Sequence, residues 1–224
     1  MFRTMDPFAE KYQGISPYTF CAGDPINFSD PTGCDVVILP IEDGEHMAML
    51  IQNEEGNWQY YSYNGTKSYV MTSQSAGRPF NDVAVGNWES PQDFLNSDYN
   101  SDSPTGTEDP SQSHFTYDIG YQISSTPEQD TVMREEFQNL SETSYNLVTN
   151  NCTQVVQKTL LKGGIDISAE TTATYTPVQT EFGIVNVVSD VKIQITNKIS
   201  VVPSTAFQEI IKANPTGNYV SKSN

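Results

Sequence analysis

A cysteine and a histidine are the two side chains of this 224-residue chain best suited to act together chemically. Cys152 follows two asparagines, which favour helix N-caps, and precedes a run with apolar residues at helical spacing that stops at a Gly-Gly pair. It is therefore expected in the first turn of a helix, where unpaired backbone N–H groups and the helix dipole favour the nucleophilic thiolate. The alternative is a small apolar residue packed in a core, as most free cysteines are.

The histidine is His46, at the start of the β-like run EHMAMLIQ. A nucleophilic cysteine needs a base that is distant in sequence and adjacent in space, and a histidine on a rigid strand supplies one. The alternative for His46 is a hydrogen-bonded histidine at a strand start. The chain's second histidine, His114, stands at the end of a polar stretch and is the reserve candidate for the base.

The polar partner of this histidine depends on the register of a hairpin. The run NWQYYSY follows EHMAMLIQ after a hairpin-length loop. A five-residue turn places Ser62 and Asn64 on the face of His46, because strand side chains alternate. A four-residue turn would place Tyr61 and Tyr63 there instead. We prefer the first register, since it supplies a short polar group to hold the imidazole tautomer.

Charge and hydropathy limit the classes of partner. The formal net charge is −17 and no Lys/Arg cluster occurs, which argues against nucleic acid as a target, because phosphate binding requires cations. Anionic membrane surfaces are disfavoured for the same reason. No apolar run approaches the ~20 residues of a membrane-spanning helix. The N-terminal segment lacks the apolar core of a usual signal peptide.

The cysteine pattern argues against disulfides and metals. Cys21, Cys34 and Cys152 form no spaced framework, so reduced thiols are expected. No CxxC motif or Cys/His cluster occurs, so a zinc site is not expected, and the chemistry requires no other metal or organic cofactor.

The remaining segments predict an α+β fold in which an antiparallel sheet packs against helices. The runs DVVILPI and FTYDIGYQI predict two further strands. Helices are expected to begin near Pro91, Pro127 and Pro203, and strands or a hairpin over 165–202. The polar stretch 96–113 is predicted to be a flexible surface loop.

The first 33 residues are rich in turns, with aromatic residues spaced between Pro and Gly. They resemble the end of the Rhs repeat-associated core domain, and the resemblance is carried by Met5–Tyr12, Ile15–Tyr18, Cys21 and Pro25–Gly33. It implies a stub of that core over 1–33 and a toxin domain over 34–224. It further implies secretion, or injection into a target cell by a specialised secretion system, and a cognate immunity protein.

In many Rhs proteins the core cleaves itself just after a DP-x-G motif. Asp30, Pro31 and Gly33 match this motif, whereas Cys34 stands where a leucine is usual. Cleavage at the Gly33/Cys34 bond is therefore left open, and the alternative for Asp30-Pro31 is a simple turn.

The order of strand histidine, polar strand residue and helix-start cysteine is similar to that of the circularly permuted papain-like thiol hydrolases, which include lecithin–retinol acyltransferase-like proteins. The segments EHMAMLI and Y-N-L-x-x-N-N-C carry this resemblance. It implies a permuted papain-like fold with Cys152 as nucleophile, His46 as base, Ser62 or Asn64 as orienting group and Asn151 as support for the oxyanion site. Thr153-Gln154 departs from the histidine or aromatic residues that often follow the cysteine there, which leaves the substrate open.

These patterns lead to the hypothesis of a papain-like cysteine hydrolase, a peptidase or amidase, that serves as an antibacterial toxin in interbacterial competition. Its substrate would be an amide bond in a peptidoglycan peptide or a protein. Two alternatives remain open: acyl transfer or lipid deacylation by the same Cys–His pair, and a non-catalytic binding tip on a degenerate scaffold. A nuclease is the most strongly disfavoured class, on charge and on the absence of a metal-binding cluster.

Overall fold

The computed structural model describes residues 35–41, 46–64, 81–100, 116–180 and 183–223. The helices and strands in these ranges are β1 (Asp35–Pro40), β2 (Met47–Gln52), β3 (Trp58–Ser62), β4 (Asp82–Trp88), α1 (Pro91–Leu95), the 3₁₀ helix η3 (Asp98–Asn100), β5 (Ile119–Ser124), α2 (Pro127–Ser141), α3 (Cys152–Lys162), β6 (Ala169–Thr180), β7 (Gly183–Ile195), α4 (Pro203–Ala213) and β8 (Asn218–Ser221). The predicted Rhs stub, Cys34 and His114 lie outside the described residues.

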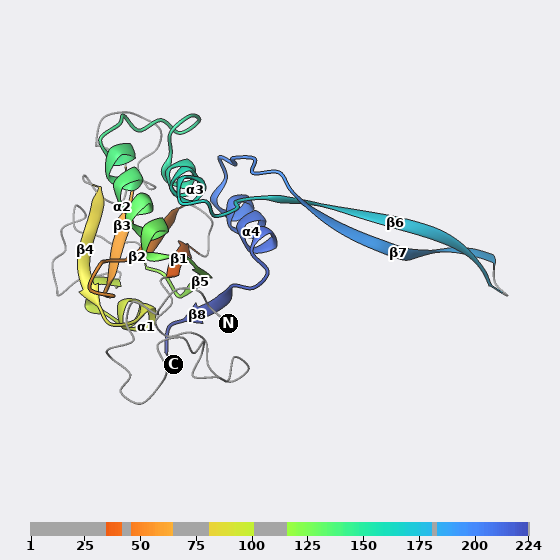
Figure 1. Cartoon of the computed structure of the whole chain (residues 1–224), viewed down its shortest axis with the longest axis horizontal. Coiled ribbons are helices and arrows are strands. Elements are labelled where there is room, and N and C mark those ends of the chain that lie inside the picture. Colours follow the sequence, from red (N-terminus) through yellow and green to blue (C-terminus); the bar gives the residue numbers. More distant parts are fainter. Residues whose placement is uncertain (1–34, 42–45, 65–80, 101–115, 181–182, 224) are drawn as a thin grey trace.

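The body of the molecule is a six-stranded antiparallel sheet with the strand order β4-β3-β2-β1-β5-β8. Helices α2, α3 and α4 pack on one face, and α1 packs on the other (Figure 1). The predicted α+β fold, an antiparallel sheet packed against helices, is confirmed.

The two central strands are apolar throughout because both of their faces are covered. In β1, Val36 and Ile38 face the three helices, whereas Val37 and Leu39 face the α1 side. The apolar residues of β2 divide in the same way. Successive strand side chains point to opposite faces, so a run buried on both sides must be apolar at every position.

The register between β2 and β3 decides which side chains join His46. Gln52 pairs with Trp58, as the five-residue turn predicts, and Met49 pairs with Tyr61. Tyr61 therefore lies on the helix-covered face, away from the histidine. The alternative four-residue turn, which would have brought Tyr61 beside the histidine, is wrong.

Local capping defines the helix that carries the cysteine. Asn151 is its N-cap, and the Asn151 side chain accepts from the backbone N–H of Gln154, whose own side chain accepts from the backbone N–H of Asn151. This reciprocal capping box satisfies two of the helix's unpaired donors. Gly163 ends the helix, as the Gly-Gly pair predicts. Cys152 consequently occupies the first helical position.

The sequence patterns predicted neither β4 nor β8. β4 and β8 lie at the two edges of the sheet, and β4 is irregular, with positive φ angles at Ala84 and Gly86. Four of its seven residues are half-buried and three are exposed, so it lacks the continuous apolar run that marks β1 and β2.

The first part of the predicted flexible loop, 96–113, is also different from the prediction. Residues 98–100 form η3, and the buried side chain of Asn100 donates to the backbone oxygens of Leu95 and Tyr117. The Asn100 side-chain oxygen accepts from the backbone N–H of Tyr117. Both backbone segments are thereby held together, and the remainder of the loop, from residue 101, lies outside the described residues.

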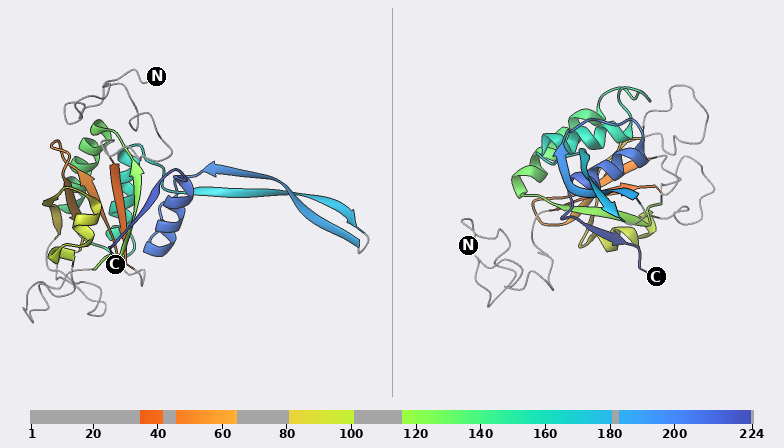
Figure 2. Two further views of the ribbon diagram at one scale, coloured as in Figure 1. Left: turned by 90° about the horizontal axis from the view of Figure 1, so that it is seen from below. Right: turned by 90° about the vertical axis from the view of Figure 1, so that its right-hand side faces the viewer.

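The predicted hairpin within 165–202 is present as β6 and β7, which pair only with each other. This two-stranded ribbon extends well away from the body (Figures 1 and 2). Among the helices of the described ranges, none combines the length and the apolar character that crossing a membrane requires.

Helix α2 buries a carboxyl group. Asp130 is 1% exposed, and its Oδ1 accepts from the Ser125 hydroxyl, whereas its Oδ2 has no hydrogen-bond partner. Burial raises the pKa of this carboxyl to about 7, against the hydrogen bond from Ser125 and the charge of Arg134, and Asp35 adds to the rise. The folded protein therefore holds an extra proton here between about pH 3.8 and pH 7.

The stabilisation from this proton is present at low pH and is lost as the pH rises through 7. Asp130→Asn removes the titration. The free energy of unfolding of the variant minus that of wild type should therefore increase by about 2–4 kcal/mol from pH 5 to pH 8. Urea unfolding at the two pH values measures the difference. Glu128→Gln, an exposed carboxyl in the same helical turn, is the control and should give no such gain. An equal offset for Asp130→Asn at both pH values would contradict the assignment.

Candidate active site

A chain of buried hydrogen bonds begins at the histidine. His46 Nε2 lies 2.8 Å from Ser62 Oγ, and the Ser62 hydroxyl donates to Asn64 Oδ1 at 2.7 Å. Asn64 Nδ2 in turn donates to Asp82 Oδ2 at 3.1 Å. The chain crosses three strands or their ends: His46 precedes β2, Ser62 ends β3 and Asp82 begins β4. The structure thus brings together three residues that the sequence predicts and one that it does not.

The direction of every bond in this chain follows from its last member. A carboxylate can only accept, so Asn64 must turn its amide nitrogen towards Asp82. Its oxygen then faces Ser62, whose single proton must be donated to it. The Ser62 oxygen is left as an acceptor for the imidazole, so His46 carries its proton on Nε2. The unprotonated nitrogen, Nδ1, has the lone pair that a base requires.

Tyrosine hydroxyls surround this chain. Tyr99 donates to Asp82 Oδ1 at 2.9 Å, so both carboxylate oxygens are hydrogen-bonded. Tyr60 and Tyr117 are buried, with their hydroxyl oxygens 2.9 Å apart, and Tyr60 also hydrogen-bonds to Ser62. Burial raises the pKa of Tyr60 and of Tyr117, so both hydroxyls remain protonated and available as donors.

The thiol of Cys152 is 4% exposed, but its neighbours are polar. The backbone N–H groups of Met47, Thr153 and Cys152 itself approach the sulfur, and Thr153 Oγ1 lies 3.8 Å from it. Burial raises the pKa of the thiol above its usual value, although these hydrogen bonds act in the opposite direction. The N–H groups of the helix start favour the thiolate as expected, but burial outweighs them.

The contact with Met47 connects the thiol to the base, because Met47 directly follows His46. Helix α3 packs on one face of the sheet, whereas His46 hydrogen-bonds on the other. The two groups are therefore linked through the start of β2, where Met47 is the first residue and His46 directly precedes it. Tyr117, on the histidine side, has its pKa raised by burial and further by the negative charge of a Cys152 thiolate.

Tyr145 is a second tyrosine whose electrostatics depend on Cys152. Burial raises its pKa, a thiolate at Cys152 raises it further, and the Tyr145 oxygen accepts from the backbone N–H of Cys152. The tyrosine also hydrogen-bonds to the sulfur. Its ring packs against that of Tyr63 in a tilted arrangement, with 5.3 Å between the ring centroids, and this contact helps to position the hydroxyl group.

Asn151, the predicted support of the oxyanion site, uses its side chain for hydrogen bonds to the backbone of its own protein. Its Oδ1 caps α3 through Gln154, and its Nδ2 donates to the backbone oxygens of Leu147 and Val201. These bonds position the loop before Cys152 and tie it to the segment that leads into α4. The side chain therefore supports the cysteine through the backbone and has no donor left for a substrate.

Three residues of the site were not assigned from sequence. Asp82 and Tyr99 come from the polar region after β3, where no pattern separates them from the other Asp and Tyr residues. Tyr145 was inside the Y-N-L-x-x-N-N-C segment, and its fixed spacing from Cys152 was a usable signal.

Burial also determines the resting charge of the site. His46 is 3% exposed, and burial lowers its pKa from 6.5 to about 3. With the thiol pKa raised, both groups are neutral near pH 7, in place of the thiolate–imidazolium pair of many thiol enzymes. Slow alkylation of Cys152 near neutral pH is therefore expected.

Within the described ranges, no three His, Cys, Asp or Glu residues group together in a way that could hold a metal ion. Comparisons of the chain with models of protein families, with curated proteins and with solved structures gave no match.

The buried neutral histidine gives a specific acid sensitivity. A group with its pKa lowered from 6.5 to about 3 binds its proton mainly in the unfolded state, so the protein loses stability as the pH falls between these values. The loss from His46 should reach about 3–5 kcal/mol, and His46→Gln, which can still donate to Ser62, should remove it. Urea unfolding from pH 7 to pH 3.5 in an Asp130→Asn background keeps the opposite titration of Asp130 out of the comparison. Identical pH slopes with and without the substitution would exclude a buried neutral histidine.

Proposed function

We propose that this chain is a cysteine hydrolase acting on an amide bond, with Cys152 as nucleophile and His46 as base. The observation that supports the proposal best is the hydrogen-bond chain Asp82–Asn64–Ser62–His46. A histidine that merely stabilised a strand would need one partner, whereas this chain fixes a tautomer and ends on a carboxylate. Nucleophile, base and orienting group are the three parts of a thiol or serine hydrolase site.

The first step is attack on the carbonyl. His46 Nδ1 takes the proton of the Cys152 thiol as the sulfur bonds to the carbonyl carbon. The resulting imidazolium is stabilised through Ser62 and Asn64 by the negative charge of Asp82. This stabilisation matters here because burial otherwise disfavours the charged imidazole.

The oxyanion requires donors beside the sulfur. The backbone N–H of Cys152 and the hydroxyl group of Tyr145 are both there, and in the resting site they bond to each other. A substrate carbonyl oxygen would accept from both groups in place of this mutual bond. Collapse of the tetrahedral species transfers the proton from His46 to the leaving amine and leaves a thioester. Water, activated by His46, then releases the acid and restores the thiol.

The biological setting we propose is that of a polymorphic Rhs-type toxin. It rests on the resemblance of residues 5–33 to the end of the Rhs core. In this setting the hydrolase is delivered into a rival bacterium, and a cognate immunity protein protects the producing cell. A peptidoglycan stem peptide and a cell protein are the two candidate substrates.

Expression of the whole chain in a test bacterium, separately in the cytosol and in the periplasm, examines the proposal. Wild type should stop growth in one compartment, and Cys152→Ala and His46→Gln should each abolish the effect while the protein still accumulates. Cys34→Ala is the matched control, since it removes a thiol that the proposed mechanism does not use, and it should remain toxic. Muropeptides, lipids and proteins from the affected cells then identify the bond that is cut. Undiminished toxicity of both site variants would refute the proposal; release of fatty acids would favour lipid deacylation.

Asp82 acts through the histidine, so its loss should slow the chemical step without weakening binding. Asp82→Asn keeps the size of the side chain and removes its charge, and should lower kcat about 10–100-fold with little change in KM. Asp82→Glu should restore part of the rate. Glu89→Gln, which removes an exposed carboxylate just beyond the other end of β4, should be as active as wild type. A change in KM alone, or an equal loss in the Glu89 variant, would contradict a positioning role.

A further inference from the structure

The ribbon of β6 and β7 is firmly attached to the body at its base. The backbone N–H groups of Thr196 and Asn197 donate to the backbone oxygen of Ser168, and the Asn197 side chain bonds to the backbone N–H of Ile167 and to Asp166. Lys198 forms an ion pair with Glu170. Beyond this base the two strands pair with each other along twelve registered positions, and neither pairs with another strand of the described ranges.

A bulge at Ser189 gives the ribbon one apolar face. Thr174 pairs with Asp190 and Tyr175 with Val188, so Ser189 is an extra residue. Without it, Val188 and Val191 would point to opposite faces. With it, one face carries five aliphatic residues of β7 that are 41–70% exposed: Ile184, Val188, Val191, Ile193 and Ile195. The neutral polar residues Asn186, Thr171 and Gln179 lie on the same face.

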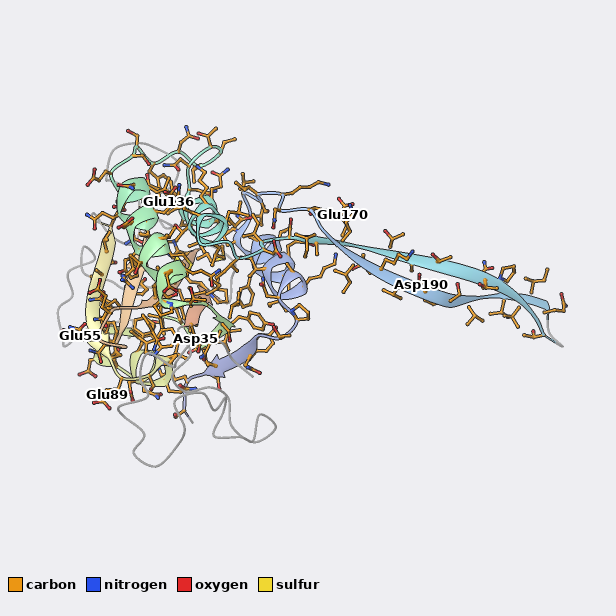
Figure 3. The ribbon with its side chains drawn as sticks, viewed as in Figure 1. Asp35, Glu55, Glu89, Glu136, Glu170 and Asp190 are labelled. Atoms are coloured by element: carbon orange, nitrogen blue, oxygen red, sulfur yellow. The ribbon has the colours of Figure 1, made fainter. Side chains whose placement is uncertain are left out.

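All charged side chains of the described ribbon lie on the opposite face. Glu170, Lys192 and Asp190 occupy positions paired with Gln194, Thr172 and Thr174, which alternate with the apolar positions. Figure 3 shows Glu170 near the base and Asp190 farther along the ribbon. Towards the tip, Val178, Val185 and Val187 make this second face apolar as well.

A two-stranded ribbon with such a face is not expected to stay solvated on both sides. Lone hairpins are marginally stable in water, and a third strand or a packed apolar face is needed for independent stability. The five aliphatic side chains expose roughly 500 Å² together, which is at the size where apolar patches mark interaction sites.

We propose that the apolar face of the ribbon binds the same face of a second copy of this chain, with the two ribbons antiparallel and the two bodies at opposite ends. A surface that is mainly aliphatic, uncharged and strand-shaped complements itself under a two-fold axis. Two such faces pack as a small β-sandwich, with the strands of the two layers nearly aligned.

The net charge of the chain favours association through the ribbons over association through the bodies. Each copy carries a net charge of −17, and Figure 3 shows acidic side chains such as Glu55, Glu89 and Glu136 spread over the body. A twelve-residue strand spans about 40 Å, so antiparallel ribbons hold the bodies several Debye lengths apart at physiological ionic strength. Association through the bodies would bring the same charges together.

The area is sufficient for a specific dimer of modest affinity. A face about 40 Å long and two strands wide buries roughly 600–700 Å² on each copy, and the total of about 1,300 Å² falls at the low end of stable interfaces.

Sedimentation equilibrium of the whole chain between about 1 and 100 μM measures the association, and wild type should be dimeric over most of this range. The double variant Val191→Glu/Ile193→Glu should weaken the dimer by about 100-fold or more, because carboxylates would have to be buried. Thr172→Glu/Thr174→Glu adds the same charge to the opposite face and should remain dimeric. A monomeric wild type at 100 μM, or equal weakening by both double variants, overturns the proposal.

Cross-linking tests which face of the ribbon lies in the interface, and it does not depend on how stable the dimer is. Val188 and Val187 are neighbours on β7 with 50% and 48% exposure, on opposite faces near the middle of the ribbon. Under mild oxidation Val188→Cys should form a disulfide-linked dimer, whereas Val187→Cys should behave like the parent chain. Preferential cross-linking of Val187→Cys, or none in either variant, contradicts the face-to-face arrangement. Unchanged circular dichroism of each variant shows that the fold is retained.

Discussion

The arrangement of the site depends on one constraint, which is that the Asp82 carboxylate can accept hydrogen bonds but cannot donate them. This fixes the orientation of the Asn64 amide, then that of the Ser62 hydroxyl, and finally the tautomer of His46. The identity of each side chain from Asp82 back to His46 therefore determines which atom of the next one carries the proton. A neutral residue at position 82 would leave every bond in the chain free to reverse.

Burial has opposite consequences for two of the titrating groups that the fold encloses. It lowers the pKa of His46 and raises that of Asp130, because in each case the charged form loses its hydration. The stability contributions consequently have opposite pH slopes in overlapping ranges and partly cancel. For catalysis, the same burial means that the site rests as a neutral pair and that charge develops only during the reaction.

Much of the fold was readable from local patterns, since those patterns have local causes. The apolar runs of β1 and β2 are apolar because both faces are covered, and the capping residues around α2 and α3 act within a single turn. The edge strand β4 was missed because none of its residues is fully buried and its backbone is irregular, so no period-two pattern exists to be read. With β4 unrecognised, its first residue, Asp82, could not be recognised as the end of the histidine's hydrogen-bond chain.

The sequence by itself predicted that Cys152 begins a helix and that His46 precedes a strand, and it reduced the residues beside the histidine to two alternatives, because capping, hairpin length and side-chain alternation are short-range effects. The observed register, in which Gln52 pairs with Trp58, selected Ser62 and Asn64. Only the tertiary structure decided what those residues meet. Asp82 and Tyr145 reach the site from strand pairing and from the packing of a loop on the sheet, and the raised thiol pKa reflects burial by distant segments. Burial and long-range contacts are properties of the folded whole, and no stretch of sequence contains them.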